Sequence, residues 1–246
     1  MELGFITSIS LTAVASVNWC NMDPMSQIKV LYIDDDEALL DMTRFIIEDL
    51  DPDIRLKTSS NINEALDNYR NYDIILTDYE MHSLDGVELA SRIRQQSDLP
   101  IIIYSNHGCE KIAEKAFTNG VNDYVRKEVE PEHYRVLAKR IKCEVDRYRS
   151  NRMLRESNER LRNIFQVSPH AIAVIDLDGR IIDCNRATLE MFGVETLEEV
   201  KGLNCLEFVA PGDILKAKRD MVNCIKRGFL KRVEYELVSD YGRRFP

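Results

Sequence analysis

The sequence lacks several features that would point to common classes of protein. Its six cysteines form no C-x-x-C pair and have no histidines at zinc-finger spacing, so reduced thiols in a cytoplasmic protein are expected. It has no excess of positive charge, because 42 acidic residues face 33 basic ones and give a net charge of −9. That balance disfavours attraction to a phosphate backbone, and no helix-turn-helix pattern follows residue 150, so no direct nucleic-acid contact is expected.

The sequence also lacks a convincing membrane segment. Leu3 to Met22 carries no charge, but polar residues interrupt it, and Glu2 stands where a signal peptide would carry basic residues. We therefore expect no membrane partner. Met25 stands directly before SQIKVLYID, so residues 1–25 are interpreted as an extension, either disordered or produced by an upstream start.

From Ile28 onward, short apolar runs alternate with amphipathic segments. The runs predicted as strands are Ile28–Ile33, Ile54–Thr58, Tyr72–Thr77, Leu99–Tyr104 and Val121–Val125. Helical periodicity between them is typical of a parallel sheet covered on both faces, which predicts a flavodoxin-like, doubly wound α/β domain. In such a sheet, sites form at the carboxyl ends of the strands, beside the point where the strand order reverses.

Polar side chains follow these predicted strands. Asp34, Asp35 and Asp36 come after the first strand, Asp78 after the third, Ser105 after the fourth and Lys127 after the fifth. Carboxylates that converge at one sheet edge repel one another unless a cation lies among them, and oxygen ligands favour Mg²⁺. Asp36 is interpreted separately as a helix N-cap.

These residues together resemble the receiver domain of two-component response regulators, over residues 26–146. The matching positions are the acidic pair Asp34-Asp35, the central motif Asp78-x-x-Met81-x-x-x-Asp85-Gly86, the hydroxyl residue Ser105, the aromatic Tyr124 and the lysine Lys127. The resemblance implies that a sensor histidine kinase phosphorylates Asp78. It also implies an Mg²⁺ ion bound directly by Asp35 and Asp78, through water by Asp34, and by the main-chain carbonyl of Glu80.

The same resemblance gives the other residues roles that agree with their chemistry. Lys127 would neutralise charge on the transferred phosphoryl oxygens, and Ser105 would donate a hydrogen bond to the acyl phosphate. Reorientation of Ser105 would make room for Tyr124 and change the surface formed by the fourth helix, fifth strand and fifth helix. The chain itself would catalyse phosphoryl transfer and hydrolysis, and no other enzymatic activity is expected.

Several positions depart from the usual receiver pattern. His82 follows the methionine where proline is common, and Glu128 follows Lys127 where a cis proline is usual, so a trans or strained peptide is expected there. Asn106 is larger than the residue usually found after the hydroxyl position and could narrow the approach to Asp78. Glu80 and His107 are predicted to overhang the site and to set the lifetime of the phosphorylated state.

A long helix or linker is predicted over residues 131–167, because neither proline nor glycine occurs between Pro131 and Pro169. One apolar stripe runs from Tyr134 to Tyr148, and a second, out of step with the first, contains Leu154, Leu161 and Phe165. Packing on the receiver explains the first stripe as well as a coiled coil does. The second stripe needs another helix to cover it, which predicts a parallel homodimer.

Asp176, Asp178, Gly179, Asn185, Gly202 and Pro211-Gly212-Asp213 stand at positions familiar from PAS domains, so residues 163–246 resemble a PAS domain, an α+β fold. We expect this domain to be incomplete, either because the sequence is a fragment or because the PAS module is reduced. Two short strands flank an Asp178-Gly179 turn, small helices follow over Ala187–Phe192 and Leu197–Val200, and a third strand is expected within Gly228–Ser239. Cys205 is interpreted as a packing residue and not as a flavin-reactive cysteine, and no organic cofactor is expected.

The sequence therefore predicts a response regulator whose output is dimerisation or contact with a partner, including control of transcription through a signalling protein. Two alternatives stay open. The chain could be the N-terminal part of a hybrid histidine kinase, although it contains no H-box histidine and no ATP-binding glycine motif. It could also be a scaffold that works without phosphorylation.

Overall fold

The computed structural model describes residues 27–82, 84–106, 110–128, 130–229, 233–238 and 244–245. Residues 1–25, predicted to be an extension, lie outside this part of the chain. Two compact units are present, the first ending at Leu154 and the second beginning at Arg155. Among the described residues, no helix combines the length and apolar character needed to cross a membrane.

The first unit is built on a five-stranded parallel sheet with the strand order β2-β1-β3-β4-β5. The strands are β1 (Ile28–Ile33), β2 (Ile54–Ser59), β3 (Ile74–Thr77), β4 (Ile101–Ser105) and β5 (Asp123–Arg126). Five of the six β1 residues are hydrophobic and fully or nearly fully buried on the two faces, as expected for a sheet covered on both sides. The predicted doubly wound fold is confirmed, with the order of strands reversing between β1 and β3.

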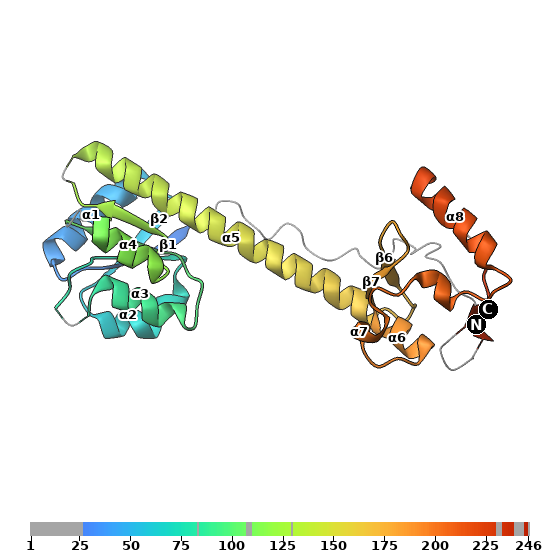
Figure 1. The fold of residues 1–246 in the computed structure, drawn as a ribbon. Helices are drawn as coiled ribbons and strands as arrows, with labels where there is room; N and C mark the ends of the chain where they lie inside the picture. Colours follow the sequence, from blue (N-terminus) through green and yellow to red (C-terminus); the bar gives the residue numbers. More distant parts are fainter. Residues whose placement is uncertain are drawn as a thin grey trace. The chain divides into compact units, whose positions relative to one another are not determined.

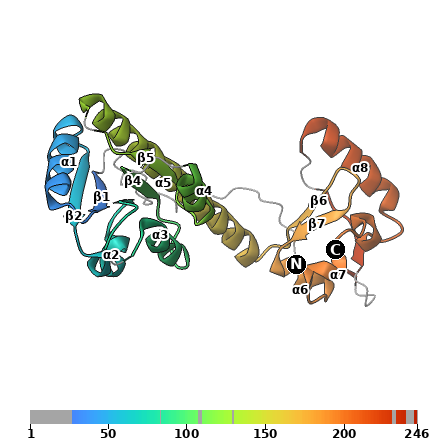
Figure 2. The same cartoon turned by 60° about the vertical axis from the view of Figure 1, so that its left-hand side comes forward.

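Two helical layers cover the sheet (Figures 1 and 2). On one face, α1 (Glu37–Leu50) and the start of α5 (Pro131–Val167) pack through residues such as Ile47 and Ile141. On the other face lie α2 (Ile62–Asn68), with the short 3-10 turn Tyr69–Asn71, then α3 (Gly86–Arg94) and α4 (Glu110–Thr118). Both cores stop at the carboxyl ends of the strands, which leaves the polar residues there at the edge of the sheet.

Three strands begin two residues later than the apolar pattern predicts. The main-chain N–H of Tyr72 donates to Tyr69 O at 3.1 Å and so completes the preceding turn. Pro100 has no N–H for the ladder, and β4 begins at the next residue. Before β5, the main-chain N–H of Asn122 donates to Ile101 O at 2.9 Å, but the N–H of Ile101 donates to the side-chain Oδ1 of Asn122 at 2.9 Å, so main-chain pairing is incomplete there.

The predicted long helix is continuous from Pro131 to Val167. Its first apolar stripe packs on the sheet of the first unit, since Tyr134, Leu137, Ile141 and Val145 are all buried in that core. The structure thus decides between the two explanations of this stripe. In the second stripe, Leu154 and Leu161 remain 60% and 62% exposed.

The second unit begins with an antiparallel hairpin of β6 (Ala173–Ile175) and β7 (Ile181–Cys184). The predicted turn is confirmed: Gly179 has φ +81°, a conformation that favours glycine. Helices α6 (Arg186–Phe192) and α7 (Leu197–Val200) follow, then a 3-10 turn at Cys205–Phe208 and helix α8 (Ile214–Arg227). Cys205 packs against the small core that contains Phe208 and Val200.

The segment expected as a third strand is only partly extended. Gly228 has φ +83° and caps α8, so the helix ends where the strand was predicted to begin. Strand β8 (Leu237–Val238) pairs with β9 (Arg244–Phe245), and Leu237 bridges to Val209.

Candidate functional site

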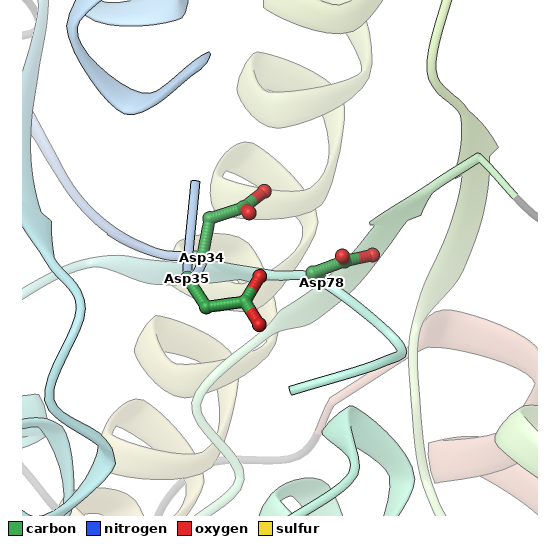
Figure 3. Close-up of side chains that lie close together, drawn as sticks. All are labelled: Asp34, Asp35 and Asp78. Atoms are coloured by element: carbon green, nitrogen blue, oxygen red, sulfur yellow. The ribbon is translucent and has the colours of Figure 1, made fainter. Parts of the chain in front are cut away.

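The topology brings three carboxylates together where strands β1 and β3 end. Asp34 and Asp35 follow β1 and Asp78 follows its neighbour β3, and one oxygen from each lies within 4.8 Å of the others. Figure 3 shows the three side chains gathered at this edge of the sheet. Asp36 takes no part in the cluster; its side chain accepts a hydrogen bond from the N–H of Leu39 at 3.1 Å and caps α1, as predicted.

Lys127 supplies positive charge to this cluster. Its Nζ lies 2.7 Å from Asp34 Oδ2 and 3.1 Å from Asp78 Oδ2, and only 6% of its side chain is exposed. Its main-chain N–H donates to the carbonyl of Ser105 at 2.8 Å, which fixes the loop after β5 to the end of β4. The Lys127–Glu128 peptide is trans, because the described residues contain no cis bond.

Backbone contacts hold Asp78 in place. Its N–H donates to Ile33 O at 2.9 Å, and its Oδ1 accepts the N–H of Tyr79 at 2.7 Å. Gly86 lies directly beside it: a Cβ at Gly86 would stand 2.2 Å from the carbonyl oxygen of Asp78. The central motif therefore needs glycine here because the helix start and the end of β3 approach too closely for a side chain.

An open depression of about 560 Å³ leads to Asp78, and its lining includes Asp35, Glu80, His82, Ser105 and Asn106. Ser105 is buried, whereas Glu80 and Asn106 are exposed at the mouth. His82 Nδ1 lies 2.6 Å from Asp35 Oδ2, so the atypical histidine contacts a member of the acidic cluster. His107 lies outside the described residues.

Tyr124 is half-buried on β5 and packs against the core shared with α3 and α4. Met81 from the loop after Asp78 contacts the same core. Tyr124 and Met81 therefore both lie on the α2–α3–α4 side of the sheet.

The contact of Tyr32 with Asp34 was not predicted from the sequence. The hydroxyl of Tyr32 donates to Asp34 Oδ2 at 2.7 Å. Its position two residues before Asp34 is a signal that could have found it, since strand residues two apart share a face. Tyr104 lies beside it, with ring centroids 6.1 Å apart, and stacks on His133 of α5 at 5.6 Å.

Comparisons with known proteins identify the class. A model of the response regulator receiver domain matches residues 30–139, and a model of the PAS domain matches residues 159–223. The protein is thus a receiver-domain response regulator in which a PAS domain follows the receiver. The acidic triad is of the kind typical of a receiver Mg²⁺ site.

Particular proteins are similar to part of this chain. The cyclic di-GMP phosphodiesterase response regulator RpfG of Xanthomonas campestris is 28% identical over 250 residues, covering 89% of this chain and 66% of the relative. The transcriptional regulatory protein ResD of Bacillus subtilis is 30% identical over 112 residues, covering 45% of this chain and 46% of the relative. The solved receiver domain of the Francisella response regulator 1452 is 27% identical, covers 50% of this chain and 99% of that chain, and has a TM-score of 0.45.

This chain spans less than two thirds of the length of those two curated relatives. Hydrolysis of a cyclic dinucleotide and control of transcription are stated in their names and describe those proteins. The two names differ in the output that they state, so similarity leaves the output of this chain to be proposed.

Proposed function

We propose that this protein is phosphorylated on Asp78 by a sensor histidine kinase in a reaction that requires Mg²⁺. The observation that carries the proposal is the buried contact of Lys127 with both Asp34 and Asp78, beside a cluster of carboxylates that opens to solvent. Three carboxylates are a hard oxygen donor set, which fits Mg²⁺. Asp35 and Asp78 would hold the ion directly, with Asp34 acting through water and Glu80 through its main-chain carbonyl.

The reaction is a transfer of a phosphoryl group between two nucleophiles. An oxygen of Asp78 forms a bond to phosphorus while the bond from phosphorus to the kinase histidine breaks, and the electron pair of that bond returns to the imidazole nitrogen. When bound, Mg²⁺ supplies charge neutralisation on the phosphoryl oxygens. Lys127 neutralises further charge, and its two present contacts place its ammonium at Asp78 before the donor arrives.

The signal would leave the site through Ser105 and Tyr124. The Ser105 hydroxyl would donate a hydrogen bond to the acyl phosphate, and Tyr124, which is half-buried against α3 and α4, would turn toward the space that this frees. The surface of α4, β5 and α5 would then change, which is a two-state element biased by one local charge event.

Dimerisation is the output that the sequence and structure favour. Leu154 and Leu161 lie seven residues apart on α5 and are mostly exposed, in contrast to the buried stripe before them. A parallel contact with the same stripe of a second copy would bury these leucines. Contact with a signalling or transcription partner through the α4–β5–α5 surface is the alternative output.

The experiment combines chemistry and assembly on the full chain. Incubation with acetyl phosphate and Mg²⁺ should add the mass of one phosphoryl group to the wild type and to Asp85→Asn, but not to Asp78→Asn. Asp85 is a matched control because it also lines the depression while its side chain caps α3. Equal labelling of Asp78→Asn and wild type would refute the assignment.

Beryllofluoride with Mg²⁺ then tests the output, read as molar mass by light scattering. A shift from monomer to dimer that is lost in the double variant Leu154→Gln, Leu161→Gln supports dimerisation. If the protein accepts the phosphoryl group but its molar mass by light scattering stays that of a monomer, contact of a partner with the α4–β5–α5 surface is favoured instead. No labelling and no response would favour a scaffold that works without phosphorylation.

A further inference from the structure

Asp34 is the most enclosed carboxylate of the cluster, with 1% of its surface exposed. Its two oxygens are used unequally. Oδ2 accepts from the Tyr32 hydroxyl and from Lys127 Nζ, each at 2.7 Å, whereas Oδ1 accepts one hydrogen bond from the described residues, donated by the N–H of Asp36 at 3.1 Å. Because a carboxylate oxygen can accept about two hydrogen bonds, Oδ2 is saturated and Oδ1 keeps capacity for an ion or its water.

Tyr32 is built to act as a donor. It is fully buried in the core under α1 and α5, and its hydroxyl donates to Asp34 Oδ2 at 2.7 Å. A buried O–H that donates to a carboxylate forms a charge-assisted hydrogen bond, which is stronger than one between neutral groups.

The hydrogen bond from Tyr32 to Asp34 also affects how Asp34 and Asp78 share the ammonium of Lys127. Lys127 Nζ lies between Asp34 and Asp78, at 2.7 and 3.1 Å. Without the tyrosine donor, Asp34 Oδ2 would rely on Lys127 alone and could rotate to follow it. With both donors present, the plane of the carboxylate is fixed at two atoms by three groups, two of them within two residues of Asp34 and the third on Lys127, 93 residues away.

We propose that Tyr32 is a positioning residue for the divalent-cation site, and that its hydroxyl fixes Asp34 so that Oδ1 faces the ion. This inference rests on the proposed function, because it assigns a role toward the same ion. Groups that orient the ligands of a metal commonly contribute about 10-fold to 100-fold to metal affinity.

Tyr104 offers a matched control. It is also fully buried in the same core, it lies beside Tyr32, and among the described residues no hydrogen bond joins its hydroxyl to the acidic cluster. Tyr32→Phe and Tyr104→Phe therefore remove the same atom from the same core, but only Tyr32→Phe removes a bond to the acidic cluster.

The test is calorimetric titration of the full-length variants with MgCl₂, together with hydrogen exchange of peptides from β3 and β4 without Mg²⁺ to compare the stability of the receiver. Tyr32→Phe should weaken Mg²⁺ binding about 10-fold, with Tyr104→Phe close to wild type. In an Asp34→Asn background, Tyr32→Phe should have no further effect on Mg²⁺ affinity, a coupling that a purely structural role would not produce.

The outcomes separate this inference from the proposed function. Wild-type affinity in Tyr32→Phe, or an equal loss in Tyr104→Phe, would overturn the role of Tyr32 while the Mg²⁺ site stands. Absence of Mg²⁺ binding to the wild type would overturn the proposed function itself.

Discussion

Removing the ammonium of Lys127 should destabilise the receiver unit strongly when Mg²⁺ is absent. The change Lys127→Met keeps an unbranched side chain but leaves Asp34 and Asp78 without their shared counter-charge. Lys127 Nζ contacts these carboxylates at 2.7 and 3.1 Å. At an effective dielectric constant of 20, Coulomb's law gives each contact about 5 to 6 kcal/mol of gross attraction.

Most of that attraction offsets the cost of burying the charges. Removal of one partner of a buried ion pair typically costs about 3 to 5 kcal/mol, because the other charge stays buried without compensation. We expect about 3 kcal/mol, the lower end, since 12% of the Asp78 side chain is exposed and water can approach it.

Lys115→Met provides the control. Lys115 pairs with Asp85 at 3.4 Å, but their side chains are 54% and 35% exposed, so that ion pair should contribute at most about 1 kcal/mol. Hydrogen exchange of peptides from β3 and β4 would measure the stability of the receiver separately from that of the second unit. Global unfolding of a chain with two units does not give one well-defined free energy.

Adding Mg²⁺ gives a second test of the same reasoning. An ion among the three carboxylates would replace part of the missing charge, so MgCl₂ should stabilise Lys127→Met more than wild type, with NaCl of equal ionic strength as the reference. The reasoning fails if Lys127→Met costs no more than Lys115→Met, or if Mg²⁺ stabilises both proteins equally.

Three further changes test other parts of the structure. Gly86→Ala should displace Asp78, because the added Cβ would lie 2.2 Å from the Asp78 carbonyl oxygen. We expect the variant to lose about 1 to 3 kcal/mol of stability and to be phosphorylated more slowly by acetyl phosphate. Gly212→Ala is the control and should match wild type, because the space around Gly212 is open. Burial lowers the pKa of His133 below its ordinary value, so the folded receiver binds this proton less readily than the unfolded chain. Stability is then full above about pH 6.5 and falls as the pH drops toward the lower folded pKa, and hydrogen exchange at pH 7.5 and 5.5 should show a smaller loss in His133→Phe. Asn185→Ala should destabilise the second unit by about 2 kcal/mol or more. The Asn185 side chain is fully buried, accepts hydrogen bonds from the N–H groups of residues 172 and 188, and donates one to the carbonyl of residue 170. Faster proteolysis between residues 163 and 192 is expected, and unchanged proteolysis would contradict the capping role.

Local patterns in the sequence predicted much of the fold. The apolar runs predicted all five receiver strands, and the absence of proline and glycine predicted the continuous helix Pro131–Val167. Strand starts were less well predicted, because they depend on which N–H groups are free to pair. Tyr72 closes a turn and the side chain of Asn122 occupies an N–H of β4, and neither bond is visible as an apolar pattern.

The candidate site divides in the same way. The sequence by itself determined that Asp34, Asp35 and Asp78 follow strands whose carboxyl ends meet at one edge of the sheet, because strand ends and turn residues are local features and parallel strands place their carboxyl ends at one edge. Only the tertiary structure decided that the ammonium of Lys127 bridges two of these carboxylates, that Tyr32 saturates one oxygen of Asp34, and that the first stripe of α5 packs on its own sheet. The physical reason is that these contacts depend on side-chain direction and on the close approach of segments as far as 93 residues apart, which apolar periodicity does not encode.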